Sequence, residues 1–236
     1  MLDPPTHAEQ EYLETIFWLG EAGLPVTASN VARARRLTPP TVHEMLVRLE
    51  RDGYIVRDAD KAIDFTAAGA EQAAAQVRRH RLAERFLTDV LGMPWDEVHE
   101  EAGRLEYAMS PQLEQRMLAA VGDATTCPHG HPFSAGPRVE GVPLADVELG
   151  ARVEVVRFEN EAEDVLGYLK TTGLEPGLTG TVVDVGDVII VADDEGGRHD
   201  VTASVAETIS VLADPSPPAR VALPAQLVLG AQRYGR

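Results

Sequence analysis

The first helix is predicted by apolar residues at helical spacing near the start of the chain. In the segment AEQEYLETIFWLGEAG, residues 8–23, the side chains of Tyr12, Ile16 and Leu19 recur every three to four positions and share one face. Two glycines end the run. We therefore expect one amphipathic helix over this segment.

A denser pattern follows in VTASNVARARRLTPPTVHEMLVRLERDGYIVRD, residues 26–58. A threonine or serine can cap a short helix, and Pro40 suits the first turn of a second one, where its missing N–H costs nothing. That second helix turns Val42, Leu46 and Leu49 inward. Two short apolar runs, YIV and IDF, then flank a DADK turn. Helix, turn, helix and hairpin together predict a winged helix-turn-helix.

The rest of the chain divides into a helical and a β-rich segment. Residues 66–121 are helical in pattern, with Thr66 able to cap a long helix and Pro94 and Ser110 able to begin two more. Prolines and glycines then cluster over residues 122–143, which are typical of a linker. From there β-branched alternation, as in GTVVDVGDVIIVADD, predicts a small all-β module.

Composition excludes several classes of protein. No apolar run reaches the roughly 18 residues of a membrane span, and the first residues have no basic-then-apolar signal region. The single cysteine excludes an internal disulfide framework and fits a reducing cytoplasm. No nucleophile–base pair, Gly-rich phosphate loop or HExxH motif is present, so we do not expect an enzyme.

Charge is unevenly distributed along the chain. The net charge is -17, which by itself disfavours binding to phosphates. Residues 27–57, however, carry six basic side chains against three acidic ones. A locally basic patch on an acidic body is compatible with DNA binding.

Residues at the start of the second helix of a helix-turn-helix face the base edges of DNA. The candidates for contacts in the groove are Thr38, Pro39, Thr41, His43 and Glu44. Flanking cations hold phosphates, and the candidates are Arg35, Arg36, Arg48 and, in the wing, Lys61. Each of them alone is also compatible with an ordinary surface position.

Three stretches give the chain a family resemblance. They are EYLETIFWL, TPPTVHEMLVRLERDGYIVRD and RRHRLAERFLTDVLGMPWDEVHEEAGRLEYAMS. The chain resembles the diphtheria toxin repressor family of metal-dependent transcriptional regulators, with features of its manganese transport regulator branch. The resemblance implies a mostly α fold with a C-terminal SH3-like barrel, and a homodimer that binds double-stranded operator DNA when divalent metal is bound.

The resemblance also gives a domain organisation. It implies a winged helix-turn-helix domain over residues 1–74, a helical metal-binding and dimerisation domain over 75–141, and an SH3-like domain over 144–214. A Pro-rich tail occupies residues 215–236.

One metal site is suggested by the string HRLAE. His80 and Glu84 are four residues apart and therefore lie on one helix face, where imidazole and carboxylate suit a first-row divalent ion. A surface ion pair is the simpler interpretation of these two residues alone. The resemblance adds His99 as a third ligand of this site.

The resemblance implies a second site built from the carboxylates of Glu11, Glu14 and Glu106. Gly103 and Tyr107 stand where the family has ligands, so Glu100, a backbone carbonyl or water would have to compensate, unless this site is vestigial. Hard oxygen ligands favour Mn²⁺, with Fe²⁺ as the alternative.

The third domain of long family members lends further ligands. In RFENEAEDVLGYL the resemblance suggests Glu161 and Asp164, with Glu163 as a rival, although for any one of them a solvated acidic loop is the simpler interpretation.

The motif CPHGHPF places Cys127, His129 and His131 within five residues. Thiolate and imidazole are metal ligands, but Pro128 and Gly130 are typical of a turn. We expect a bend that leaves the helical domain, with metal binding as the alternative.

These expectations combine into a manganese-activated DNA-binding regulator. An iron-responsive regulator of the same family is the first alternative. A metal-buffering protein that does not bind DNA is the second.

Overall fold

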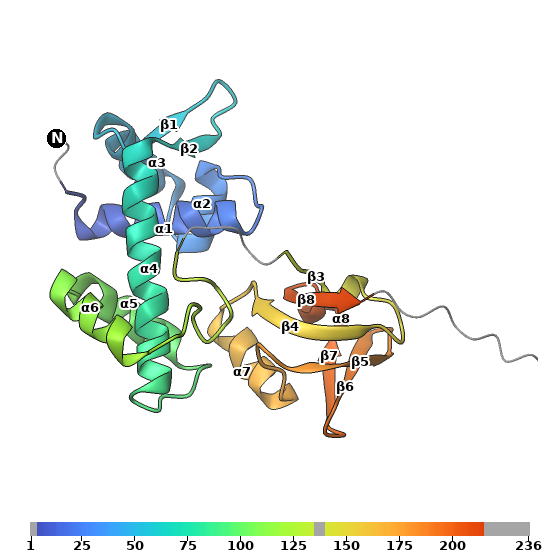
Figure 1. The fold of residues 1–236 in the computed structure, drawn as a ribbon. Coiled ribbons are helices and arrows are strands. Elements are labelled where there is room, and N and C mark those ends of the chain that lie inside the picture. The colour runs from blue at the N-terminus through green and yellow to red at the C-terminus, as the bar shows by residue number, and fades with distance from the viewer. Residues whose placement is uncertain (1–3, 135–139, 215–236) are drawn as a thin grey trace, which may run out of the picture.

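The computed structural model describes residues 4–134 and 140–214, and a long helix forms its axis (Figure 1). The predicted Pro-rich tail, residues 215–236, lies outside the described residues. The fold is mostly helical with a C-terminal antiparallel sheet, which confirms the predicted fold class. No helix among the described residues has the length and apolarity needed to cross a membrane.

The first module is a winged helix-turn-helix at one end of this axis (Figure 1). It contains α1 (His7–Glu21), α2 (Ala28–Arg35), α3 (Pro39–Arg51), β1 (Ile55–Arg57) and β2 (Ile63–Phe65). The hydroxyl of Thr27 caps α2 by accepting the amide N–H of Asn30. Val42, Leu46 and Leu49 of α3 are fully buried, as their spacing predicts, and pack with apolar residues of α1.

The second module is built on the axial helix α4 (Ala67–Asp89). Thr66 caps it by accepting the amide N–H of Gly69, as the sequence predicts. A Cβ on Gly69 would lie 1.8 Å from the carbonyl oxygen of Tyr54, so only glycine lets α4 start this close to the wing. The module is completed by α5 (Val98–Leu105), the short 3₁₀ helix η1 (Glu106–Ala108) and α6 (Pro111–Ala120). Helix α5 begins four residues after the predicted start at Pro94.

The third module is a six-stranded antiparallel sheet in the order β3-β8-β4-β5-β6-β7. Its strands are β3 (Val142–Pro143), β4 (Arg152–Phe158), β5 (Thr179–Asp184), β6 (Val188–Asp193), β7 (Arg198–Thr202) and β8 (Ile209–Asp214). It also contains the helices η2 (Leu144–Asp146), α7 (Glu163–Thr172) and α8 (Ala203–Ala206), which strand alternation did not predict. Leu166 and Leu169 of α7 are fully buried in the core of this module.

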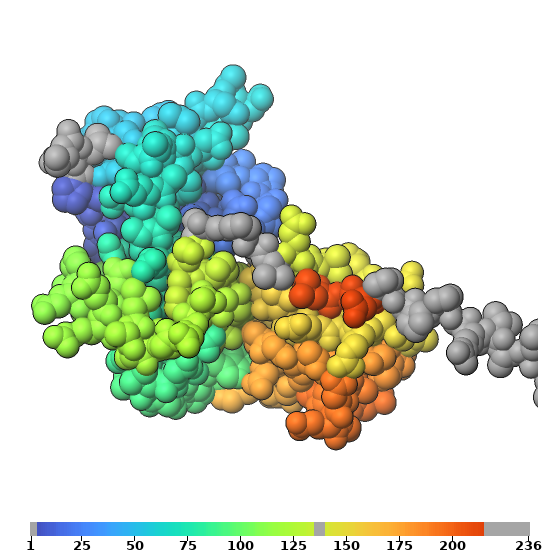
Figure 2. All heavy atoms as spheres, viewed as in Figure 1, coloured from blue at the N-terminus to red at the C-terminus, as the bar shows by residue number. Residues whose placement is uncertain are grey.

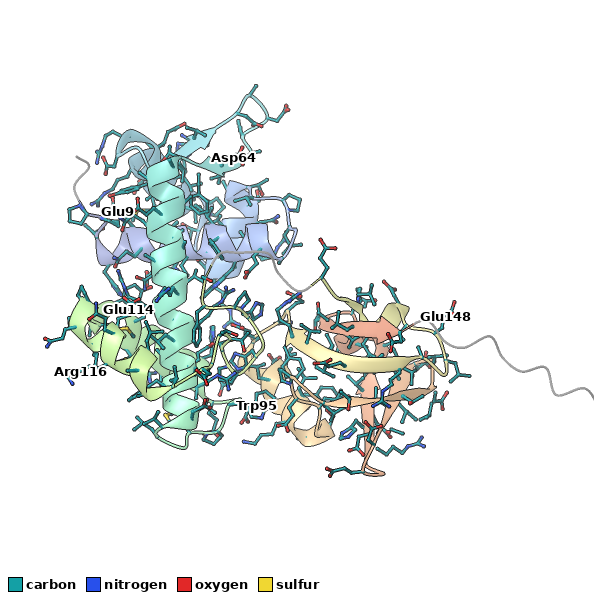
Figure 3. All side chains as sticks on the ribbon, viewed as in Figure 1. Glu9, Asp64, Trp95, Glu114, Arg116 and Glu148 are labelled. Carbon is teal, nitrogen blue, oxygen red and sulfur yellow. The ribbon has the colours of Figure 1, made fainter. Side chains whose placement is uncertain are left out.

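Residues 125–134 join the helical module to the sheet as a packed turn (Figure 2). Arg85 of α4 donates hydrogen bonds to the carbonyl oxygens of Thr126 and Cys127. Trp95 lies at the same junction (Figure 3), with its ring centroid 5.7 Å from that of Phe158 at the end of β4. The segment predicted as part of a linker therefore fixes the two modules against each other.

Candidate metal centre

The centre is built around one face of α4. His80 and Glu84 are four residues apart on this helix and are both buried. The His80 Nε2 atom is 3.1 Å from Glu84 Oε1 and 3.1 Å from His99 Nδ1, while His99 Nδ1 is 3.0 Å from Glu84 Oε1. The three helical residues expected to form one site therefore meet.

A fourth side chain reaches this group from the sheet module. Glu161 lies in the loop between β4 and α7, and its Oε2 is 3.4 Å from His99 Nδ1. The ligand atoms of His80, Glu84, His99 and Glu161 all lie within 4.8 Å of one another. Two imidazoles and two carboxylates suit a first-row divalent ion.

A second cluster shares two of these residues and adds part of the CPHGH turn. His129 Nδ1 is 3.4 Å from Glu84 Oε2 and 3.5 Å from Glu161 Oε1. With the thiol of Cys127, these side chains form another group of four possible ligands within 4.8 Å. Cys127 and His129 are both fully buried.

The turn itself explains this placement. The amide N–H of Cys127 donates to the carbonyl of His131 at 2.8 Å, and Gly130 adopts a φ of 92°. A Cβ on Gly130 would lie 2.1 Å from the Val156 carbonyl oxygen, so glycine lets the turn pack directly on β4. The expected bend is present, and it turns Cys127 and His129 inward, where both are buried beside Glu84. In the sequence, the signal for this cluster was the close spacing of the thiol and two imidazoles in CPHGHPF.

A third cluster connects α4 to α1 and η1. His80 Nδ1 is 2.6 Å from Glu106 Oε2 and 3.9 Å from Glu14 Oε1. Tyr107 donates a hydrogen bond of 3.4 Å to Glu14 Oε2, and the space beside Gly103 is open. Of the ligands expected for the carboxylate-rich site, Glu14 and Glu106 are thus brought together, and His80 joins them.

Protonation in these clusters is governed by burial and by close opposite charges. Burial alone would lower the pKa of His80, but the carboxylates of Glu84, Glu106 and Glu14 hold it well above its ordinary value. In the same way Glu84, above all, holds the pKa of His129 well above its ordinary value against burial. Burial raises the pKa of Glu14 to about 8.

Several buried atoms of the centre form no hydrogen bond. Among the described residues these include Glu14 Oε1 in the cluster with Glu106. They also include Glu84 Oε2 and His129 Nδ1 in the cluster with Cys127. Glu84 Oε2 and His129 Nδ1 lie 3.4 Å apart and pair only while the imidazole is protonated. A bound cation that displaces this proton would satisfy all three atoms through their lone pairs. The donor set therefore fits a divalent metal.

Three residues predicted as ligands are not brought to the clusters. Glu11 pairs with Arg35, with 2.7 Å between Oε2 and Nη2. Glu100 is exposed and lies 3.2 Å from Arg104 of the same helix. Asp164 is exposed in the first turn of α7.

An acidic cleft of about 900 Å³ leads from solvent to this centre. His99, His131 and Glu161 line it, as does Trp18, whose ring centroid is 5.8 Å from that of His99. Its rim is lined by further carboxylates, including those of Glu97, Glu100, Glu101, Glu163 and Asp164.

The helix-turn-helix presents the predicted groove residues to solvent. Thr38, Pro39, Thr41, His43 and Glu44 are all exposed at the start of α3. The hydroxyls of Thr38 and Thr41 are 2.9 Å apart. Lys61 is exposed in the wing turn with a φ of 63°.

The predicted phosphate contacts differ in their partners. Arg48 pairs with Glu9, with 2.8 Å between Nε and Oε1, and Arg35 pairs with Glu11. Arg36 instead lines the acidic cleft. Carboxylates of α1 thus form ion pairs with two of these arginines.

Comparison with known proteins identifies the family. Residues 6–63 match the profile described as iron dependent repressor, N-terminal DNA binding domain, and residues 66–134 match its metal binding and dimerisation domain. Residues 142–213 match the FeoA domain. The iron-dependent repressor IdeR of Mycobacterium leprae is 35% identical over 198 residues, which span 76% of this chain and 86% of that protein. The chain belongs to the iron-dependent repressor family.

Solved structures give the same result for this repressor. A manganese-dependent transcriptional repressor in complex with manganese superimposes with a TM-score of 0.79 at 30% identity, covering 87% of this chain and all of that one. The IdeR of T. acidophilum gives 0.74 at 26% identity, covering 89% of this chain and all of that one. The repressor is therefore a metal-dependent transcriptional regulator.

Proposed function

We propose that this repressor binds Mn²⁺ at the clusters around Glu84 and binds operator DNA as a homodimer in its metal-bound state. One ion would be held by His80, Glu84, His99 and Glu161, and another by Glu84, Cys127, His129 and Glu161. A bound cation supplies positive charge to a region crowded with carboxylates. The observation that carries the proposal is the set of buried atoms in these clusters that form no hydrogen bond.

The link from metal to DNA runs through α1. This helix packs across α4 (Figure 1) and carries Glu14 to His80 and Glu106. It also carries Glu9 and Glu11 to the arginines of the helix-turn-helix. If ions bind better to the arrangement that closes α1 on α4, linkage requires that arrangement to become more populated. The recognition helices of a dimer would then be held at the spacing of two half-sites.

The homodimer is supported by exposed apolar side chains on the helical module. Val90 and Leu91, just after α4, and Leu113 of α6 are exposed. The matched profile of this module is described as a dimerisation domain. Operator recognition would use the exposed start of α3, with Lys61 and flanking arginines on phosphates.

Fe²⁺ is the second candidate, and one observation favours it. The preference for manganese rests on carboxylate and imidazole ligands without thiolate, which holds for the His80–Glu84–His99–Glu161 cluster. The Cys127 thiol in the second cluster is softer and suits iron better.

The test is operator binding by fluorescence anisotropy with Mn²⁺, anaerobic Fe²⁺ and Mg²⁺. The proposal expects Mn²⁺ to raise operator affinity at least tenfold and Mg²⁺ to have little effect. If excess Mn²⁺ leaves operator affinity unchanged and Fe²⁺ raises it, iron rather than manganese is the activating metal. No response to either ion and no sequence-selective footprint would support metal buffering instead.

A further inference from the structure

His131 is buried beside the metal clusters but belongs to none of them. Its side chain is 7% exposed. The Nε2 atom is 2.8 Å from the Phe158 carbonyl oxygen and 3.2 Å from Glu161 Oε1. The Nδ1 atom forms no hydrogen bond and is 3.7 Å from Glu21 Oε2.

These contacts fix the orientation of the ring. A carbonyl oxygen can only accept, so the Nε2 atom carries a hydrogen and donates it to Phe158. The same N–H lies within reach of the Glu161 carboxylate. On the Nδ1 side of the ring, Glu21 forms an ion pair with Arg81. Arg81 also donates a 2.9 Å hydrogen bond to the Pro132 carbonyl. Each ring nitrogen therefore has a neighbouring carboxylate, Glu161 at Nε2 and Glu21 at Nδ1.

The turn and the end of β4 are joined by two hydrogen bonds at one residue. The amide N–H of Phe158 donates to the carbonyl of His129 at 3.0 Å, and its carbonyl accepts from His131. Phe158 is three residues before Glu161, which is the member of these clusters that comes from the sheet module. The position of the Glu161 carboxylate thus depends on how the turn holds the end of β4.

We propose that His131 is a positioning residue that holds the Glu161 carboxylate in place for a divalent cation and keeps the sheet module attached to the metal centre. The proposal rests on the proposed function, because it assumes that the clusters bind metal. Groups that orient a ligand from outside the coordination sphere typically change metal affinity about 10- to 100-fold when removed.

The experiment measures Mn²⁺ binding to the full chain by isothermal titration calorimetry. His131→Ala is expected to weaken binding at the Glu161-containing clusters by about tenfold or more. His131→Gln places an amide N–H near the position of Nε2 and is expected to retain most of the affinity. His199→Ala is the matched control, because the partly buried His199 of the sheet module likewise lies between a carbonyl, that of Thr172, and a carboxylate, that of Asp193.

A double-mutant cycle separates positioning from general stability. If His131 acts through Glu161, then adding His131→Ala to Glu161→Gln should cost little further affinity. A His131→Ala protein that melts earlier but binds Mn²⁺ as the parent does would overturn the proposal, and so would equal losses with and without Glu161→Gln. If the parent binds no Mn²⁺, both this proposal and the proposed function fail. If the parent binds Mn²⁺ and His131→Ala weakens that binding, but Mn²⁺ does not alter operator affinity, only the proposed function fails.

Discussion

Glu84 offers its two carboxylate oxygens to different imidazoles. Oε1 lies near His80 and His99, while Oε2 lies near His129. The side chain is fully buried, and although burial would raise its pKa, His129 and His80 hold the pKa well below its ordinary value. Glu84 thus stays a carboxylate and belongs to two clusters at once.

Replacing Glu84 should therefore have the largest effect of any single ligand. Glu84→Gln keeps the volume but removes the charge, and we expect Mn²⁺ affinity to fall by more than about 100-fold, beyond the range typical of outer partners. Titration calorimetry measures the loss. Glu100→Gln is the control, because Glu100 is exposed and paired with Arg104. A larger loss in the control than in Glu84→Gln would move the centre to the outer face of α5.

Metal binding should release protons and strengthen as pH rises. The pKa values of His80 and His129 are held well above the ordinary value, and that of Glu14 is raised to about 8, so all three carry protons near pH 7. A ligand must lose its proton to bind a cation, so protons compete with metal. Calorimetry in two buffers with different ionisation enthalpies counts the released protons. Affinity that is constant from about pH 6 to pH 8 would contradict this assignment.

The residues that sequence predicts best are those on a single helix. His80 and Glu84 are four positions apart, so the spacing alone puts them together. Cys127 and His129 join Glu84 through tertiary contacts, such as the packing of Gly130 on β4 and the hydrogen bonds from Arg85 to the turn, and no local spacing reports a contact between segments some forty residues apart. The same limit explains why Glu11 could not be separated in advance from the ligands, since its partner is Arg35 on another helix.

Helix α1 carries carboxylates toward both functions of the repressor. Its Glu14 side chain faces the metal clusters, while Glu9 (Figure 3) and Glu11 hold arginines of the helix-turn-helix. The Arg35 guanidinium also stacks over the ring of Tyr12, with 4.9 Å from Cζ to the centroid. An arginine held by a carboxylate is less available to a phosphate.

Freeing Arg35 should therefore raise the DNA affinity of the metal-free protein. We expect Glu11→Gln to bind DNA more tightly in chelator, with a salt dependence steeper by roughly one unit in log–log slope, as for one added phosphate contact. Anisotropy at several salt concentrations gives this slope. Glu148→Gln makes the same charge change on the distant sheet module (Figure 3) and should leave the slope unchanged. The prediction fails if Glu11→Gln keeps its effect when Arg35 is also replaced by alanine.

The helices follow from the helical spacing of apolar residues more completely than the sheet module follows from strand alternation. The inward residues of α3 and the Thr66 cap of α4 follow directly from spacing and capping chemistry. Helix α7 lies in a segment dominated by strands, and its acidic first turn was interpreted as a solvated loop, so the helix was missed. Its burial comes from Leu166 and Leu169, whose spacing alone is too short a signal.

The metal clusters lie where the helical module meets the sheet module. Helix α4, the turn at residues 125–134 and the β4–α7 loop all supply side chains to the clusters around Glu84. Each module has its own apolar core, and Trp95 of the helical module also packs against the sheet core, so the metal centre adds a polar connection to an apolar one. Such a connection should make the modules unfold together when the ion is bound and more independently when it is removed.

Calorimetric melting with Mn²⁺ and with chelator tests this coupling. A ligand at 100 times its dissociation constant stabilises the folded state by about 2.7 kcal/mol, which for a chain of this size corresponds to about 5–10 °C in Tm. We expect a single transition at the higher temperature with Mn²⁺ and a broader or split transition in chelator. Glu161→Ala should remove most of the gain, because it cuts the ligand that the sheet module supplies. Glu163→Ala, an exposed neighbour outside the clusters, should keep the gain, and equal losses in both variants would mean that the sheet module is held by packing rather than by metal.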